Sequence, residues 1–184
     1  MPVMSSPSGA DGRHVAAPAD HDRRRAVDVL VDPSLQALVE MVVSSPAPNL
    51  YEARSVDGAV RFRRRPTARG WDFEVEAVEG RHPLDDQDPT RFAPLSAEMA
   101  APQPDRRANS YPYAYEHVAQ VFDHPCAPDL CVIHTASHRQ EDHRGEHGSI
   151  GVVQARAPFV LAGAGVRTDG VVDRHCRLVD VAPT

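Results

Sequence analysis

Residues 128–166, PDLCVIHTASHRQEDHRGEHGSIGVVQARAPFVLAGAGV, decide the fold that the sequence predicts. They contain two short apolar runs, Leu130–Ile133 and Pro158–Leu161, separated by a polar loop rich in histidine. Apolar runs of about four to six residues between turn signals are typical of strands in a covered sheet. Ligands collect at the carboxyl ends of strands in open α/β sheets, so we expect chemistry first in the loop after Ile133.

The composition indicates one globular domain. With 184 residues the chain can form one hydrophobic core, but it is too short for a second full domain. The net charge of -6 argues against binding of duplex nucleic acid, which needs a dominant basic surface. Neither a membrane span nor a signal peptide is visible, so the default expectation is a cytoplasmic protein that does not bind membranes. All 20 basic residues are arginine, which indicates a GC-rich bacterial genome.

Two helices are predicted after an unstructured start. Residues 1–25 lack apolar periodicity and are expected to be disordered. Asp32-Pro33 followed by apolar residues at helical spacing predicts a helix that runs to about Val43. A second helix is expected over Pro112–Phe122, where one side is apolar and an Asn or Ser precedes it.

A small antiparallel sheet is predicted between these helices. The Asp57-Gly58 turn predicts a hairpin of residues 50–65, because Asp-Gly suits a two-residue turn. The alternation of apolar and acidic residues in Trp71–Val78 predicts a third strand with one wet face. We interpret residues 48–80, approximately, as an insertion on the main sheet, followed by a long connection over 80–110.

The main sheet is expected to be of the parallel type with helical cover. The order after residue 112 is helix, strand, crossover and strand, which favours that arrangement. An edge strand is expected within Gly170–Val181. Both ends of the chain resemble cut ends of a larger domain.

The histidine loop permits two readings as a metal site. Cys126, Cys131, His143 and His147 have a spacing close to that of a two-Cys, two-His zinc finger. Against this, Cys131 lies inside an apolar run, where a free cysteine behaves as a small hydrophobe. The small zinc-binding domain therefore stays an alternative.

His147 has a local context that suits a metal ligand. It lies in Gly145-Glu146-His147-Gly148-Ser149, where the flanking glycines let the backbone approach a ligand closely. Glu146 or a nearby acidic residue could hold its ring in the neutral form that binds metal. The competing reading is an ordinary exposed loop histidine.

Four motifs in order carry a resemblance to a known family. They are Arg144–Ser149, Arg156–Gly163, Gly165-Val166 and the closing Val179–Thr184. Together with the strand that begins at Pro128-Asp129, they resemble the C-terminal part of the catalytic domain of the alkaline phosphatase superfamily. The most similar branch is the type I phosphodiesterase / nucleotide pyrophosphatase family. The resemblance covers residues 128–184 well and 26–127 loosely.

The resemblance implies an α/β fold, a partial three-layer α/β/α sandwich, in which residues 26–184 are an incomplete C-terminal portion. It implies a metal-dependent phosphodiesterase with two divalent metals, usually zinc, and a small phosphodiester or nucleotide substrate. His147 matches the family's late histidine ligand, and Asp20 and His21 faintly match an earlier metal motif. The nucleophile is expected upstream of this chain, so the isolated chain is expected to be inactive. A non-catalytic binding module is the alternative.

Overall fold

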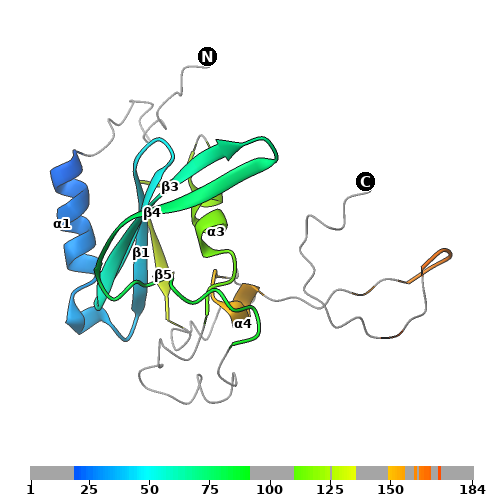
Figure 1. Cartoon of the computed structure of the whole chain (residues 1–184). Coiled ribbons are helices and arrows are strands. Elements are labelled where there is room, and N and C mark those ends of the chain that lie inside the picture. The colour runs from blue at the N-terminus through cyan, green and yellow to red at the C-terminus, as the bar shows by residue number, and fades with distance from the viewer. Residues whose placement is uncertain are drawn as a thin grey trace, which may run out of the picture.

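The computed structural model describes residues 19–91, 110–124, 126–135, 149–155, 160, 162–166 and 170. Its main feature is a five-stranded sheet in the order β4-β3-β2-β1-β5. Every neighbouring pair of these strands is antiparallel. The helices α1 and α3 lie on opposite sides of this sheet, which gives the chain its mixed α/β content (Figure 1).

The first helix begins inside the segment that was expected to be disordered. α1 spans Asp20–Leu30, so residues 20–25 are helical, while residues 1–18 lie outside the described part of the chain. Asp20 and Asp22 occupy the first turn, where carboxylates interact favourably with the helix dipole. Val27 is buried against the sheet, and this tertiary contact stabilises a helix whose sequence is otherwise polar.

The predicted helix from Asp32 to about Val43 is wrong. The Asp32 carboxylate does accept a hydrogen bond from the Ser34 N–H at 2.9 Å, but the 3-10 turn η1 ends at Leu35 (Pro33–Leu35). The chain then forms β1, Val39–Ala47, with four consecutive buried residues from Met41. A β-branched, continuously apolar run suits a strand covered on both faces, and this outweighed the helical spacing of the same residues.

The predicted hairpin and third strand are confirmed. β2 spans Leu50–Ser55, β3 spans Gly58–Thr67 and β4 spans Gly70–Gly80. β2 pairs directly with β1, so these strands belong to the same five-stranded sheet as β1 and β5. The sequence could not show this continuity, since it depended on recognising β1 as a strand.

The second helix and the strand after it are also confirmed. α3 spans Ala114–Val121 and β5 spans Leu130–His134. The expectation of a parallel-type sheet is wrong for the described strands, because β5 pairs antiparallel with β1, for example Val43 with Cys131. The predicted strand at Pro158–Leu161 and the edge strand within Gly170–Val181 lie outside the described residues, apart from Val160 and Gly170.

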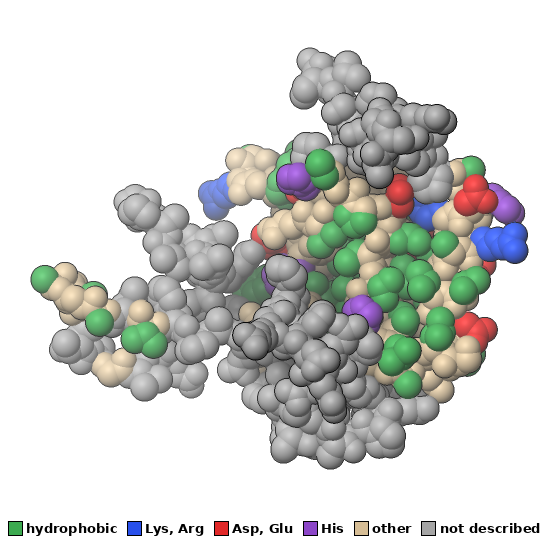
Figure 2. All heavy atoms as spheres, turned by 180° about the vertical axis from the view of Figure 1, so that it is seen from behind, with side chains coloured by type: hydrophobic (Ala, Val, Ile, Leu, Met, Phe, Trp, Pro, Cys, Tyr) green, Lys and Arg blue, Asp and Glu red, His purple; other side chains and the backbone are tan. Residues whose placement is uncertain are grey.

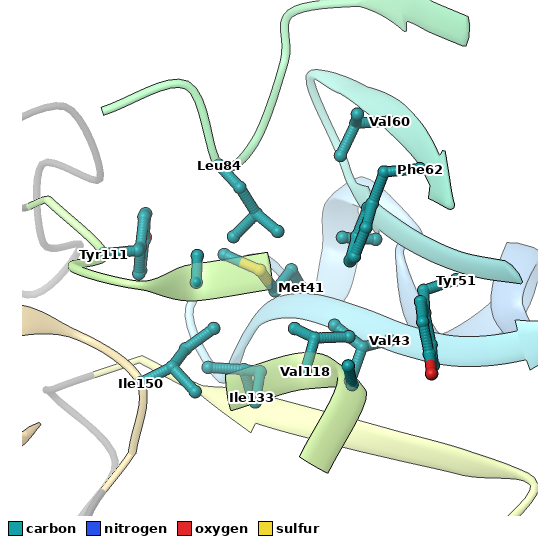
Figure 3. Close-up of a cluster of buried hydrophobic side chains, with 13 residues drawn as sticks. Met41, Val43, Tyr51, Val60, Phe62, Leu84, Tyr111, Val118, Ile133 and Ile150 are labelled. Atoms are coloured by element: carbon teal, nitrogen blue, oxygen red, sulfur yellow. The ribbon is translucent and has the colours of Figure 1, made fainter. Parts of the chain in front are cut away.

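One hydrophobic core lies between the sheet and α3 (Figure 3). The sheet supplies Tyr51 and Phe62, whose ring centroids are 5.4 Å apart, and α3 supplies Val118. Leu84, from the segment after β4, is fully buried and closes one side of this core. Ile150, just before the short helix α4 (Val152–Ala155), packs on the same cluster. The core therefore covers the middle of the sheet and leaves β4 at its margin.

Candidate functional site

The structure brings none of the predicted metal ligands into a cluster within the described residues. His143 and His147 lie outside them, so their roles stay predictions. Asp20 is an exposed residue of α1, and its carboxylate accepts from the Arg23 guanidinium at 2.9 Å. His21 Nδ1 lies 3.2 Å from the carboxylate of Asp22. This donor set does not fit a zinc centre, because zinc sites use three or four converging ligands.

The two cysteines of the alternative zinc site lie in different surroundings. Cys131 is in β5, packs against the hydrophobic core, and has a raised pKa because of burial. Cys126 is exposed in the turn before that strand. Burial keeps the Cys131 thiol protonated, which disfavours the thiolate that zinc binds. Cys131 is thus confirmed as a strand residue packed against the core, but its side chain is half-buried rather than buried.

The edge strand β4 carries exposed apolar side chains. It is one edge of the described sheet, and its hairpin with β3 reaches beyond the other strands (Figure 1). Trp71, Val75 and Val78 are 56%, 42% and 47% exposed, although apolar residues on a strand face are usually covered. We call these three residues the apolar row.

A bulge aligns the apolar row on one face. Val75 is paired with Phe62, and Val78 is paired with Val60, so both lie on the face that carries the core. The register shifts between Arg61 and Phe62, which leaves Glu76 as the extra residue of β4. Without this bulge the alternation would place Ala77, rather than Val78, beside Val75.

The hydrogen-bonding groups of Phe73 point away from the sheet. The Phe73 N–H donates to the Asp72 carboxylate at 2.9 Å instead of to β3. Its partner Arg64 donates its own N–H towards β2, to the Asn49 carbonyl at 2.9 Å. By the alternation of an antiparallel pair, the N–H groups of Trp71 and Val75 point outward with that of Phe73. β4 thus presents both apolar side chains and backbone donors along one edge.

The other face of β4 is acidic. Its charged residues are Asp72, Glu74, Glu76 and Glu79, which we call the acidic row. Three of them pair with arginines of the sheet: Glu76 with Arg63 and Glu74 with Arg65 of β3, each at 2.5 Å, and Glu79 with Arg54 of β2 at 3.3 Å. The side chains of Glu74 and Glu79 are still 56% and 71% exposed. Carboxylate oxygens therefore remain accessible along this edge.

Arg64 holds the hairpin in place. Its guanidinium donates two hydrogen bonds to Asp123, at 2.8 and 2.6 Å, and two to the Asn49 side chain. It also lies over the Trp71 ring, 4.4 Å from the ring centroid. The Asp123 hydrogen bond raises the pKa of Arg64. This side chain is only 12% exposed and connects β3 to Asp123, which follows α3.

A groove of about 320 Å³ lies between α1 and the acidic face of the sheet. Its lining contains four arginines and four carboxylates, among them Arg61, Glu52 and Glu79. Many of these pair with one another, for example Arg61 with Glu52 at 2.8 Å. The four arginines and four carboxylates of the lining balance in formal charge.

A half-buried histidine, His82, follows the hairpin. His82 Nδ1 accepts from the Leu84 N–H at 3.0 Å, so the proton of the neutral ring is on Nε2, which is 2.9 Å from the Tyr115 hydroxyl. Burial lowers the pKa of His82, and the nearby Asp85 opposes this shift. The contacts suit a structural role that joins the segment after β4 to α3.

The side of the molecule hidden in Figure 1 also carries hydrophobic side chains (Figure 2). Exposed apolar residues outside β4 include Val29 on α1 and Leu38 before β1, at 61% and 46%.

In the described part of the chain, no helix has the length and apolar character needed to cross a membrane.

Comparison with protein-family models, with curated proteins and with solved structures finds no match. The resemblance to the alkaline phosphatase superfamily therefore stays a prediction from residues 128–184. The site that sequence reasoning missed is the β4 edge. The alternation in Trp71–Val78 predicts a strand, but the position of that strand at the edge of the sheet is a property of the tertiary structure.

Proposed function

We propose that this chain is a non-catalytic binding module that takes up an extended segment of a partner protein along the free edge of β4. The observation that carries the proposal is the exposed apolar row on an edge strand whose Phe73 N–H is not used by the sheet. Strand addition uses these two features together, because backbone hydrogen bonds give affinity and alternate side chains give specificity.

The contacts of Arg64 support this proposal. Binding costs conformational entropy when the receiving strand must first become ordered. Arg64 of β3 bonds to Asp123 and Asn49 and lies over the Trp71 ring of β4, and these contacts favour the hairpin conformation before a partner arrives. They lower the conformational entropy that β4 itself would lose on binding.

A proline substitution tests the role of the edge. Val75 and Phe62 form a pair that does not exchange ladder hydrogen bonds, so Val75→Pro removes an outward N–H while keeping the β3–β4 ladder. We expect the variant to keep the circular dichroism and melting temperature of the parent within a few degrees, and to lose binding of a β-strand peptide. The matched control is Val75→Ala, which keeps the N–H and should bind measurably. Equal peptide binding by Val75→Pro and Val75→Ala would contradict strand addition.

A metal-dependent phosphodiesterase within a three-layer α/β/α sandwich is the second proposal. Its support is the resemblance of Arg144–Ser149 and the motifs after it, with His147 as a residue that would hold one of two zinc ions. The antiparallel pairing of β5 with β1 weighs against it, because the expected core has a parallel-type sheet.

Zinc-dependent hydrolysis separates the two proposals. The binding module predicts no hydrolysis of bis-p-nitrophenyl phosphate above the metal-only background, and the same result for His147→Ala. Hydrolysis by the parent chain that is lost in His147→Ala would favour the phosphodiesterase. Zinc stoichiometry of Cys126→Ser tests the zinc-finger alternative, which predicts loss of bound zinc in that variant.

A further inference from the structure

The charges of the hairpin alternate from strand to strand. On the face turned away from the core, β3 presents Arg61, Arg63 and Arg65, while every charged residue of β4 is acidic. Arg63 and Arg65 each lie 2.5 Å from a carboxylate of β4. Opposite charges directly across neighbouring strands stabilise the pair, and like charges destabilise it. The next strand position, beyond β4, therefore favours basic side chains.

A second copy of this chain is a poor occupant of that position. Two β4 strands side by side would place one acidic row against another, and β4 contains no basic residue to relieve the repulsion. Charged side chains and bulges on an edge strand are devices that prevent such self-pairing. The bulge at Glu76 adds to this effect.

We propose that the partner of the β4 edge is an extended segment that alternates arginine with apolar residues, the pattern that β3 already presents to β4. This inference rests on the proposed binding function. The partner's apolar side chains lie beside Trp71, Val75 and Val78, and its arginines lie beside Asp72, Glu74 and Glu79.

Asp72 has a specific part in this recognition. In the free chain its carboxylate accepts from the Phe73 N–H and so covers the exposed donor of the edge. An incoming strand supplies a carbonyl to that N–H, and this releases the carboxylate to a partner guanidinium. Arginine suits the exchange because its planar fork can bind one carboxylate while neighbouring carboxylates keep their own partners.

Three peptides of about nine residues, the usual upper range of strand lengths, test the inference. They alternate valine with arginine, with serine or with glutamate, and isothermal titration measures their affinity for the full chain. We expect the arginine peptide to bind about ten-fold more tightly than the serine peptide, and the glutamate peptide to show no binding. The preference for arginine should shrink at high salt, because exposed charges are screened.

Variants locate the effect on the acidic row. The double change Asp72→Asn with Glu74→Gln should bring the affinity for the arginine peptide close to that of the serine peptide. Asp129→Asn, an exposed carboxylate beside β5 at the opposite edge of the sheet, is the control and should change neither affinity. Equal affinity for all three peptides would overturn the charge preference and leave strand addition in place. Absence of binding by all three would overturn the proposed function itself.

Discussion

Gly58 shows how one residue sets the geometry of the hairpin. The turn is formed by Val56 and Asp57, and Gly58 is already paired with Gly80 as the first residue of β3. A Cβ atom at Gly58 would lie 2.3 Å from the Glu79 carbonyl oxygen. Glycine is required here by the close approach of the neighbouring backbone, whereas the Asp57-Gly58 motif suggested only a turn.

Gly58→Ala should lower the free energy of unfolding by about 2 to 3 kcal/mol, because the new methyl group must displace backbone atoms of β4. Urea denaturation followed by circular dichroism measures the effect. Gly151→Ala is the control, since nothing lies within 4 Å of the added Cβ there, and it should change stability by less than about 0.5 kcal/mol. Equal stability of the two variants would contradict the close packing of β4 against the turn.

The lowered pKa of His82 makes the free energy of unfolding decrease at acidic pH. Its pKa in the folded chain is lowered by burial from the ordinary value near 6.5. Below about pH 6.5 the unfolded chain takes up a proton that folded His82 does not, and this lowers the free energy of unfolding. The stabilisation is therefore full at higher pH and is lost as the pH falls from 6.5 through the folded pKa of His82.

The comparison of parent and His82→Gln isolates this contribution. We expect the stability lost by the parent between about pH 7.5 and about pH 5.5 to exceed the loss of the variant. Chemical denaturation at both pH values measures it, and the other histidines cancel in the difference. An identical loss in both proteins would show that His82 is not shielded from water in the fold.

At the scale of elements, β2, β3 and β4 were predictable and β1 was not. The apolar and acidic alternation of Trp71–Val78 predicts a strand, and the Asp57-Gly58 turn predicts the hairpin before it. β1 contains Met41, Val42 and Val43 in succession, because α1 covers one face and the core covers the other. A run that is apolar on both faces has no period, so the capping signal at Asp32 suggested a helix instead.

The candidate site could be predicted only in part for the same reason. The acidic and apolar alternation of β4 is visible in the sequence, but the exposure of Trp71 and Val75 is not. That exposure arises because α3 covers the middle of the sheet, where Phe62 contacts Tyr115 with ring centroids 4.5 Å apart. Phe73 is half-buried beside these two rings, and the part of the sheet covered by α3 ends at this residue. The sequence pattern predicts which residues share a face of the strand. It does not predict which face stays exposed to solvent in the folded chain.

At the scale of the whole molecule, charge and shape agree with a basic partner. In the proposed binding mode, the net charge of -6 would attract a basic segment over a distance, and the acidic row would provide the contact. The neighbouring strand β3 is bonded to Asp123 through Arg64, whose guanidinium also lies over the Trp71 ring of β4. A domain of this kind needs no movement of its core to bind.

Amide hydrogen exchange, resolved to single residues, tests strand addition most directly. If the valine–arginine peptide pairs with β4, its addition should slow amide exchange at the outward N–H groups of Phe73 and Val75. Exchange at Glu74, whose N–H faces β3, should change little. Unchanged exchange at Phe73 and Val75 in the presence of bound peptide would contradict strand addition, because the peptide would then bind elsewhere than the β4 edge.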